Sequence, residues 1–371
     1  MPGIIDRIKA LVSRRAEAPT SVTPAPATGA PRKPVLGLAG FFGAGNYGDE
    51  LFLEVFEQYF GDEFELRVLA DKTSQPYYSR PVAEIVNEVD AILIGGGDIL
   101  QPWGRDPRYF NPAFLKKPCF VVGIGVPQYR NAKPARPEVI ERHKAFFRNA
   151  NLKRIGVRDD QAAKWIREHL EPELPVLVAP DIVCTLDLPD APKPAGAPIL
   201  GVVTRFRPNR EVPDDYTQVK RLAETAQQQG WRIRHLILGT AEVGRRDASN
   251  AADLDVPGKE VFYSEDLQEI TRAIGECSAF ASMKFHGSVV ATMYGIPSVV
   301  MIATNKNVNF MKRIGLSALL SQFDAPDLTE KWLNRPEVDL ADVKRIRAES
   351  DAHMRELVAE VKATVGQTTA A

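Results

Sequence analysis

The feature that most constrains the fold of this chain is a regular alternation of short apolar segments with amphipathic ones, which begins near residue 35. The apolar segments have the length of buried strands, and the amphipathic ones have helical spacing. Alternation of this kind predicts parallel sheets that are covered by helices on both faces. Strands are predicted at residues 35–42, 65–70, 91–94, 120–125, 154–157, 176–179 and 182–186, then at 199–204, 233–238, 260–262, 280–283 and 298–302. Helices are predicted at residues 49–60, 138–149, 159–170, 216–229, 266–275, 288–294 and 340–365.

A proline-rich stretch separates the two series of strands. Residues 189–198 carry four prolines and no periodicity, which is typical of a linker between domains. We therefore predict an α/β fold with two Rossmann-like domains, at residues 35–188 and 199–335, and a C-terminal helix and tail at 336–371. A length of 371 residues suits two domains. The cleft between them is the default position for a ligand.

The first 34 residues differ from the rest of the chain. In residues 1–15, apolar side chains fall on one side of a helix and basic ones on the other. Such a segment could lie on an anionic membrane surface, or it could be a short frayed helix with no such role. Residues 16–34 are rich in Pro, Ala and Thr, which indicates a disordered tether.

Composition excludes several classes of function. A formal net charge of -1 argues against a general nucleic-acid binder, which needs a basic excess. Cys119, Cys184 and Cys277 lie far apart in apolar runs, which indicates reduced, buried thiols in a cytosolic protein. No paired-cysteine spacing suggests a metal, and no apolar run is long enough to cross a bilayer. We expect a cytoplasmic protein without a metal, with peripheral contact to the inner face of the membrane as an option.

Lys284 and His286 lie between the end of a predicted strand and the start of a predicted helix. In an open α/β sheet, ligands bind at the carboxyl ends of the strands, and the positive end of the next helix favours a phosphate or carboxylate. Gly287 would let a ligand approach the backbone closely. A purely structural role is the commoner one for a single histidine, but this position favours an anion site.

The other four histidines offer weaker candidates. His143, His169 and His353 lie in charged helical surroundings and are expected on solvated faces. His235 lies beside a predicted strand, and its role stays open.

The loop at residues 43–48 matches the G-x-G-x-x-G fingerprint of dinucleotide-binding proteins, between a strand and a helix. Asp71 would be the acidic residue that such a site needs, although it comes late. Asp49 and Glu50 put negative charge where a pyrophosphate would lie, and they would repel it. Either a helix N-terminus with favourable acidic residues or a site for a neutral hydroxylated ligand explains the loop better.

Two further junctions carry polar groups. Residues 95–98 place three glycines and an aspartate at a strand end, which indicates close approach by a ligand or a tight structural turn. Arg158 and Lys306 also follow predicted strands, and parallel topology would bring Lys306 near His286. A salt bridge or an ordinary surface position is the alternative for each cation.

The order of these motifs resembles the polysaccharide pyruvyl transferase family. The resemblance runs from about residue 35 to 316 and includes an Asn-x-Gly-Asp-Glu loop, Gly-Gly-Gly, Val-Arg-Asp, Pro-Asp, x-x-His-Gly and a later lysine. It implies a GT-B-like fold with an acceptor-side N-terminal domain and a donor-side C-terminal domain. It also implies that a pyruvyl group passes from phosphoenolpyruvate to a sugar of a cell-surface polysaccharide or its lipid-linked precursor, forming a ketal, with no further cofactor.

The resemblance implies roles for three residues: His286 would act as acid or base, and Arg158 and Lys306 would bind the donor. The loops and junctions themselves suggest the other site residues. We expect Asp49 as a second catalytic group, Lys284, Gly287 and Ser288 as further donor-binding residues, and Asn46, Gly48, Gly96, Gly97 and Asp98 as acceptor-binding residues. The chain departs from the family at Lys284, where arginine is usual, and a lysine loses the bidentate grip on an anion.

Three other functions compete with this hypothesis. A GT-B glycosyltransferase would place the diphosphate of a nucleotide sugar where we place phosphoenolpyruvate. A dinucleotide-dependent oxidoreductase would use the loop at 43–48. A carbohydrate-binding protein without catalytic activity would keep only the fold.

Overall fold

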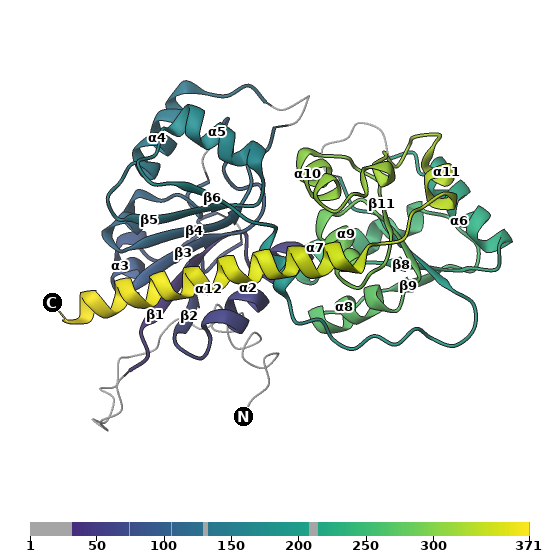
Figure 1. Ribbon diagram of the computed structural model, residues 1–371, viewed down its shortest axis with the longest axis horizontal. Coiled ribbons are helices and arrows are strands. Elements are labelled where there is room, and N and C mark those ends of the chain that lie inside the picture. The colour runs from purple at the N-terminus through teal and green to yellow at the C-terminus, as the bar shows by residue number, and fades with distance from the viewer. Residues whose placement is uncertain (1–31, 74, 105, 129–132, 208–213, 371) are drawn as a thin grey trace.

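The computed structural model describes residues 32–73, 75–104, 106–128, 133–207 and 214–370. They form two parallel sheets with flanking helices, one sheet in each half of the molecule, as Figure 1 shows. The predicted two-domain α/β architecture is confirmed. The predicted basic segment at residues 1–15 and most of the predicted tether lie outside the described residues. In the part of the chain that is described, no helix combines the length and apolarity needed to span a membrane.

The first sheet has six strands in the order β2-β1-β3-β4-β5-β6, and all its pairs are parallel. Its strands are β1 (Val35–Ala39), β2 (Glu65–Val68), β3 (Ala91–Gly95), β4 (Cys119–Ile124), β5 (Leu152–Val157) and β6 (Val176–Val178). The helices of this half are α2 (Tyr47–Phe60), α3 (Val82–Asn87), α4 (Pro137–Phe147) and α5 (Asp160–Leu170). The central strands β1, β3 and β4 are buried along their whole length, as apolar runs covered on both faces should be.

The second sheet has five parallel strands in the order β11-β10-β7-β8-β9. Its strands are β7 (Ile199–Val203), β8 (Arg232–Leu236), β9 (Glu260–Phe262), β10 (Ala279–Ser282) and β11 (Ser298–Val300). Its helices are α6 (Thr217–Gln228), α7 (Ala241–Ser249), α8 (Leu267–Gly275), α9 (Phe285–Met293), α10 (Asn305–Arg313) and α11 (Leu328–Leu333).

Two local predictions are wrong. The predicted strand at 182–186 is a short 3-10 helix, η2 (Ile182–Thr185), because the Asp181 side chain accepts a hydrogen bond from the Val183 amide and caps a turn there. The predicted helix at 288–294 begins earlier, at Phe285, so Lys284 is its N-cap residue and His286 lies in its first turn.

The long helix α12 (Leu340–Ala370) joins the two halves of the molecule. It runs from the second domain across to the first, as Figure 1 shows, and it packs on η2 and α2. Its inward side buries Ile346, Met354, Leu357 and Val361 completely. The helix therefore belongs to both cores.

Polar contacts with β5 add to this packing. The Arg154 guanidinium pairs with Glu356 at 3.3 Å and contacts Nδ1 of His353 at 3.1 Å. His353 and His143 are both buried, so the prediction that they lie on solvated faces is wrong. Burial and, to a smaller extent, the charge of Arg154 lower the pKa of His353 to about 4.

The buried face of α12 generates a test. We expect Leu357→Ala to lower the free energy of unfolding by about 2–5 kcal/mol, because the lost side chain leaves a cavity between the helix and the first domain. Chemical denaturation followed by circular dichroism measures this change. Arg355→Ala, on the exposed side of the same helix, is the matched control and should leave stability nearly unchanged. Equal effects of the two substitutions would contradict the packing assigned to α12.

Candidate functional site

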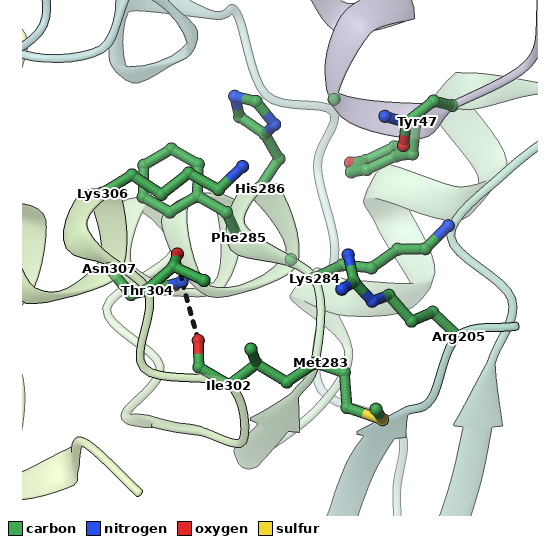
Figure 2. A pocket seen from close by; sticks show the side chains of 13 residues that line it. Tyr47, Arg205, Met283, Lys284, Phe285, His286, Ile302, Thr304, Lys306 and Asn307 are labelled. Atoms are coloured by element: carbon green, nitrogen blue, oxygen red, sulfur yellow. Dashed lines mark hydrogen bonds between the residues drawn. The ribbon is translucent and has the colours of Figure 1, made fainter. Parts of the chain in front are cut away.

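A cavity of about 320 Å³ lies where the two domains meet. The start of α2 contributes Asn46, Tyr47 and Gly48 from the first domain, and the starts of α9 and α10 contribute His286 and Lys306 from the second (Figure 2). The structure thus brings together residues that are more than two hundred positions apart in the chain. Each of these residues lies at the start of a helix that follows a strand, and therefore at the carboxyl edge of its sheet. Ligands bind at this edge in open α/β folds.

The glycine-rich loop at residues 43–48 makes contacts at the domain interface, and its amides are not free to bind a dinucleotide. The carboxylate of Glu50 accepts hydrogen bonds from the amides of Gly43 (2.5 Å) and Gly45 (3.0 Å), the groups that would cradle a pyrophosphate. The carbonyl of Gly45 in turn accepts from the Thr240 amide of the second domain at 2.8 Å. A bound dinucleotide would have to displace Glu50, so the fingerprint does not mark a dinucleotide site here.

The imidazole of His286 is held between the domains. Its Nε2 lies 3.4 Å from a carboxylate oxygen of Asp181, and Phe52 and Phe285 pack edge-on against the ring. The other nitrogen, Nδ1, faces Gly48 so closely that a Cβ atom at residue 48 would lie 1.8 Å from it. Gly48 is therefore the residue that leaves room for the ring, and Nδ1 is the nitrogen directed toward the side of the cavity that Gly48 lines.

Arg158 and Lys306 converge on Asp98. The buried guanidinium of Arg158 pairs with Asp98 and, at 3.5 Å, with Asp181. The ammonium of Lys306 lies 3.2 Å from the other oxygen of Asp98. Both cations also face the ring of Phe285, at 5.2 and 5.6 Å from its centroid. The salt bridge that the sequence left open for Arg158 is present, and it is part of the site.

The carboxyl groups of the site differ in pKa. Burial disfavours the Asp98 carboxylate, but the charges of Lys306 and Arg158 prevail and lower its pKa to about 2. Burial also disfavours the Asp181 carboxylate, but the interactions with His286 and Arg158 outweigh burial and lower the pKa of Asp181. For Asp49 burial prevails over His286 and Lys306 and raises the pKa. Asp49 is thus the carboxyl group of this cluster that most readily takes up a proton.

Lys284 points away from His286. Its ammonium donates to the backbone carbonyl of Leu238 at 2.5 Å and pairs with Asp247, and burial lowers its pKa. Asp247 also accepts from the amide of Phe206 at 2.8 Å. Lys284 therefore fixes the segment that carries Arg205, and Arg205 lines the cavity beside it, as Figure 2 shows.

Of the predicted donor ligands, Gly287 lines the cavity and also has a packing role, whereas Ser288 has a packing role only. A Cβ atom at Gly287 would lie 2.6 Å from Leu238 and 2.7 Å from the hydroxyl of Ser282, so this glycine allows α9 to approach the sheet. The hydroxyl of Ser288 is buried and bonded to that of Ser298 at 2.9 Å. The Ser288 side chain faces the core and is not part of the cavity wall.

The predicted acceptor residues divide into two groups. Asn46 and Gly48 line the cavity. Gly96, Gly97 and Asp98 lie behind it, and Cβ atoms at the two glycines would lie 3.8 and 3.7 Å from Asp49. Gly96 has a φ of 119°, a backbone conformation that favours glycine. Of the two alternatives for residues 95–98, the structure therefore shows the tight turn.

Two helix N-termini open into the cavity. Neither the N-cap of α9 (Lys284) nor that of α10 (Thr304) uses its side chain to cap the helix. Both N-cap residues and the first-turn residues His286 and Lys306 line the cavity. Uncapped first-turn amides together with the positive helix end attract an anion.

Three residues of the site were missed from the sequence. Asp181, Arg205 and Phe285 were not assigned to it, although each touches the cluster or the cavity. The Pro-Asp pair that ends at Asp181 was the available signal. Nothing in the sequence distinguishes Arg205 from other exposed arginines. Among the described residues, no group of three or more His, Cys, Asp or Glu side chains could hold a metal ion.

Comparison with known proteins gives a family and a fold for the chain. The family model described as polysaccharide pyruvyl transferase matches residues 46–305. Among curated proteins, none matches the chain in sequence. The UDP-GlcNAc 2-epimerase from Neisseria meningitidis bound to UDP-GlcNAc has a similar fold, with a TM-score of 0.54, 11% identity, and 88% of this chain and 98% of that chain covered. The UDP-N-acetylglucosamine 2-epimerase from Rickettsia bellii also has a similar fold, with a TM-score of 0.51 and 12% identity, and with 90% of this chain and 97% of that chain covered. The predicted GT-B-like fold is confirmed.

Gly48 and His286 should be coupled energetically. We expect Gly48→Ala to lower the free energy of unfolding by about 1–3 kcal/mol, because the new methyl group overlaps the imidazole. In a His286→Ala background the same change should become neutral or stabilising, since alanine is the better helix former. A double-mutant cycle by chemical denaturation measures the coupling. A Gly48→Ala cost that persists without the imidazole would contradict the contact.

Asp98 and Asp49 should affect stability in opposite directions. A lowered pKa means that Asp98 stabilises the fold above the unfolded-state pKa of about 3.9 and that this contribution is lost as the pH falls toward 2. Asp98→Asn should therefore cost about 3 kcal/mol at pH 7, because the buried Arg158 and the half-buried Lys306 lose a charged partner. A raised pKa means that Asp49 disfavours the fold as the pH rises above about 4, so Asp49→Asn should raise stability at pH 7.

Thermal unfolding of both variants between pH 3 and pH 7 checks these signs. Destabilisation by Asp49→Asn at pH 7 would show that the buried carboxylate is better compensated than its surroundings indicate.

Proposed function

Because the chain belongs to the polysaccharide pyruvyl transferase family, we propose that it transfers a pyruvyl group from phosphoenolpyruvate to a sugar of a cell-surface polysaccharide or its lipid-linked precursor, and that the product is a pyruvate ketal. The observation that carries the proposal is the pair of uncapped helix N-termini, α9 and α10, that open into one cavity beside His286.

The donor carries two anionic groups, a carboxylate and a phosphate. Two helix N-termini supply two sets of amide donors for them. Lys306 and Arg205 line the same cavity and add positive charge. Arg158 acts from behind, by fixing Asp98 and thereby Lys306. In this proposal the donor-binding side chains are Lys306 and Arg205, and Lys284 positions Arg205.

Ketal formation needs one proton at carbon and one leaving phosphate. The imidazolium of His286 gives its Nδ1 proton to the methylene carbon of phosphoenolpyruvate, which becomes a methyl group and leaves a cationic centre at the adjacent carbon. One sugar hydroxyl attacks that carbon and loses its proton. Phosphate then leaves with the electron pair of its C–O bond, and a second hydroxyl closes the ketal, with its proton balancing the charge of the phosphate.

Two carboxyl groups support His286 in this proposal. Asp181 lies against Nε2 and stabilises the imidazolium, as the buried partner of a catalytic histidine does. Asp49 follows Gly48 on α2, and burial raises its pKa, which suits a group that takes up the hydroxyl proton. The acid and the base then come from different domains, so the reaction requires the domain contact.

Binding of the donor can be tested before any acceptor is known. We expect phosphoenolpyruvate, and not NADH or nucleotide sugars at equal concentration, to raise the melting temperature. The gain corresponds to about 2.7 kcal/mol at a hundredfold excess over Kd. Arg205→Ala should reduce the shift, whereas Arg246→Ala, an exposed arginine on α7, should not. A shift with nucleotide sugars alone would favour a glycosyltransferase instead.

Turnover tests the role of His286. His286→Asn should keep the melting shift with phosphoenolpyruvate but abolish release of phosphate from it in the presence of a panel of acceptor sugars, because asparagine cannot supply the proton. Normal phosphate release by this variant would remove His286 from the mechanism.

A further inference from the structure

The domain interface extends beyond the cavity to a contact between two helices. Helix α8 of the second domain lies beside α2 of the first, as Figure 1 shows. Two side-chain hydrogen bonds join them: the hydroxyls of Tyr47 and Thr271 lie 2.6 Å apart, and the side-chain amide of Gln268 donates to the carboxyl group of Glu54 at 2.8 Å. Tyr47 and Glu54 lie two turns apart on one face of α2, and Gln268 and Thr271 lie one turn apart on one face of α8. One face of each helix is therefore bonded to the other domain.

Glu54 is a buried acid without a countercharge. Its exposed fraction is 4%, and within the described ranges no cation pairs with it. A buried carboxylate is tolerated only when it is paired, so burial favours the protonated form. Burial raises the pKa of Glu54 to about 7, although the hydrogen bond from Gln268 acts in the opposite direction. The protonated carboxyl group still accepts the bond from Gln268 and needs no cation.

The elements that pack on α2 do not compensate a charge on Glu54. Their titratable groups beside α2 are Asp266, Glu269 and Arg272 of α8, Cys184 of η2, His286 of α9, and Asp351, Arg355 and Lys362 of α12. The charge of Asp266 acts on Glu54, and it has the same sign. Glu269 and Arg272 are exposed, burial raises the pKa of the Cys184 thiol, and the groups of α9 and α12 have ionic partners elsewhere. Helix α2 itself carries no cation.

The contact connects directly to the candidate site. Tyr47, which bonds to Thr271, lines the cavity beside His286, as Figure 2 shows. Gly48 leaves room for the imidazole, and Asp49 follows it in the first turn of α2. The position of α2 against α8 therefore sets the position of this turn relative to His286.

We propose that Glu54 is a positioning residue, and that its bond with Gln268 is a proton-dependent contact between the domains. With its proton, Glu54 keeps the bonded faces of α2 and α8 together. When it releases the proton to solvent, the buried carboxylate draws in water and the contact loosens, so α2 loses its alignment with His286 as the solution becomes more basic. The consequence for donor binding rests on the proposed function, whereas the contact itself does not.

Chemical denaturation of the whole protein between pH 5 and pH 8.5 gives the first test. A raised pKa means that the folded protein holds the proton more tightly than the unfolded chain, so stability falls as the pH rises from about 4.5 to about 7 and then levels off. Relative to Glu54→Gln, the folding equilibrium of the wild type should lose about a hundredfold over this range. Gln268→Lys should remove most of this loss by supplying a cation. Glu269→Gln, on the exposed side of α8, is the matched control and should follow the wild type.

Hydrogen exchange of the amides of α8 tests whether the contact loosens. We expect these amides to exchange about tenfold or more faster in the wild type than in Glu54→Gln at pH 8.5, and at equal rates at pH 5.5. Equal exchange in the two proteins at pH 8.5, or a pH dependence of stability that Glu54→Gln leaves unchanged, would overturn the inference.

Donor binding separates this inference from the proposed function. The melting shift with phosphoenolpyruvate should decrease between pH 6 and pH 8.5 more in the wild type than in Glu54→Gln. Exchange of α8 that depends on Glu54, without a melting shift at any pH, would support the contact and remove the proposed function.

Discussion

A chain of alternating charges, buried at Arg158 and Asp181 and partly buried at its ends, lies between the two domains and determines the rest of this site. It runs from Lys306 to Asp98, Arg158, Asp181 and His286, and neighbours in the chain have opposite charge when His286 is protonated. Buried charges are tolerated only when they are paired, and removal of one leaves its neighbours uncompensated. Since Lys306 and His286 come from the second domain and the other three from the first, the pairing also fixes how the domains meet.

This pairing has a consequence for ligand binding. The cations that the sequence suggests for the donor are largely neutralised by aspartates, so the side chains alone provide little excess charge for a trivalent anion. Under the proposed function, the uncapped N-termini of α9 and α10 would provide the missing attraction, because their amides belong to rigid helices and need no countercharge. The ion pairs would then preorganise the site, and the backbone would contribute much of the attraction for the donor.

Much of the fold followed from the sequence, because strand and helix periodicities are local. Lys306 was expected near His286, since the carboxyl ends of adjacent parallel strands lie at one edge of a sheet. Arg158 follows a strand of the other sheet, so its place beside them did not follow from this argument. The partners that His286 and Lys306 find in the first domain, Asp181 and Asp98, did not follow from local patterns, because these contacts form only when the domains meet. The Pro-Asp pair at Asp181 was the one local signal for this residue, and it was not used. The start of α9 was also missed, since its N-cap is Lys284 and carries no capping signal.

Lys284 shows why a residue type at a motif position does not settle its role. The arginine that is usual in the family would offer its planar guanidinium to an anion for two parallel hydrogen bonds. Its replacement by Lys284 therefore suggested a weakened donor site. In this structure the ammonium has one backbone carbonyl, that of Leu238, and one carboxylate, that of Asp247, as partners. These two acceptors suit a compact point charge and do not require a planar fork. Arg205, which the Lys284–Asp247 pair holds at the cavity, supplies a guanidinium from another strand end. The departure at Lys284 is therefore compatible with a complete donor site, in which positioning and binding are divided between two residues.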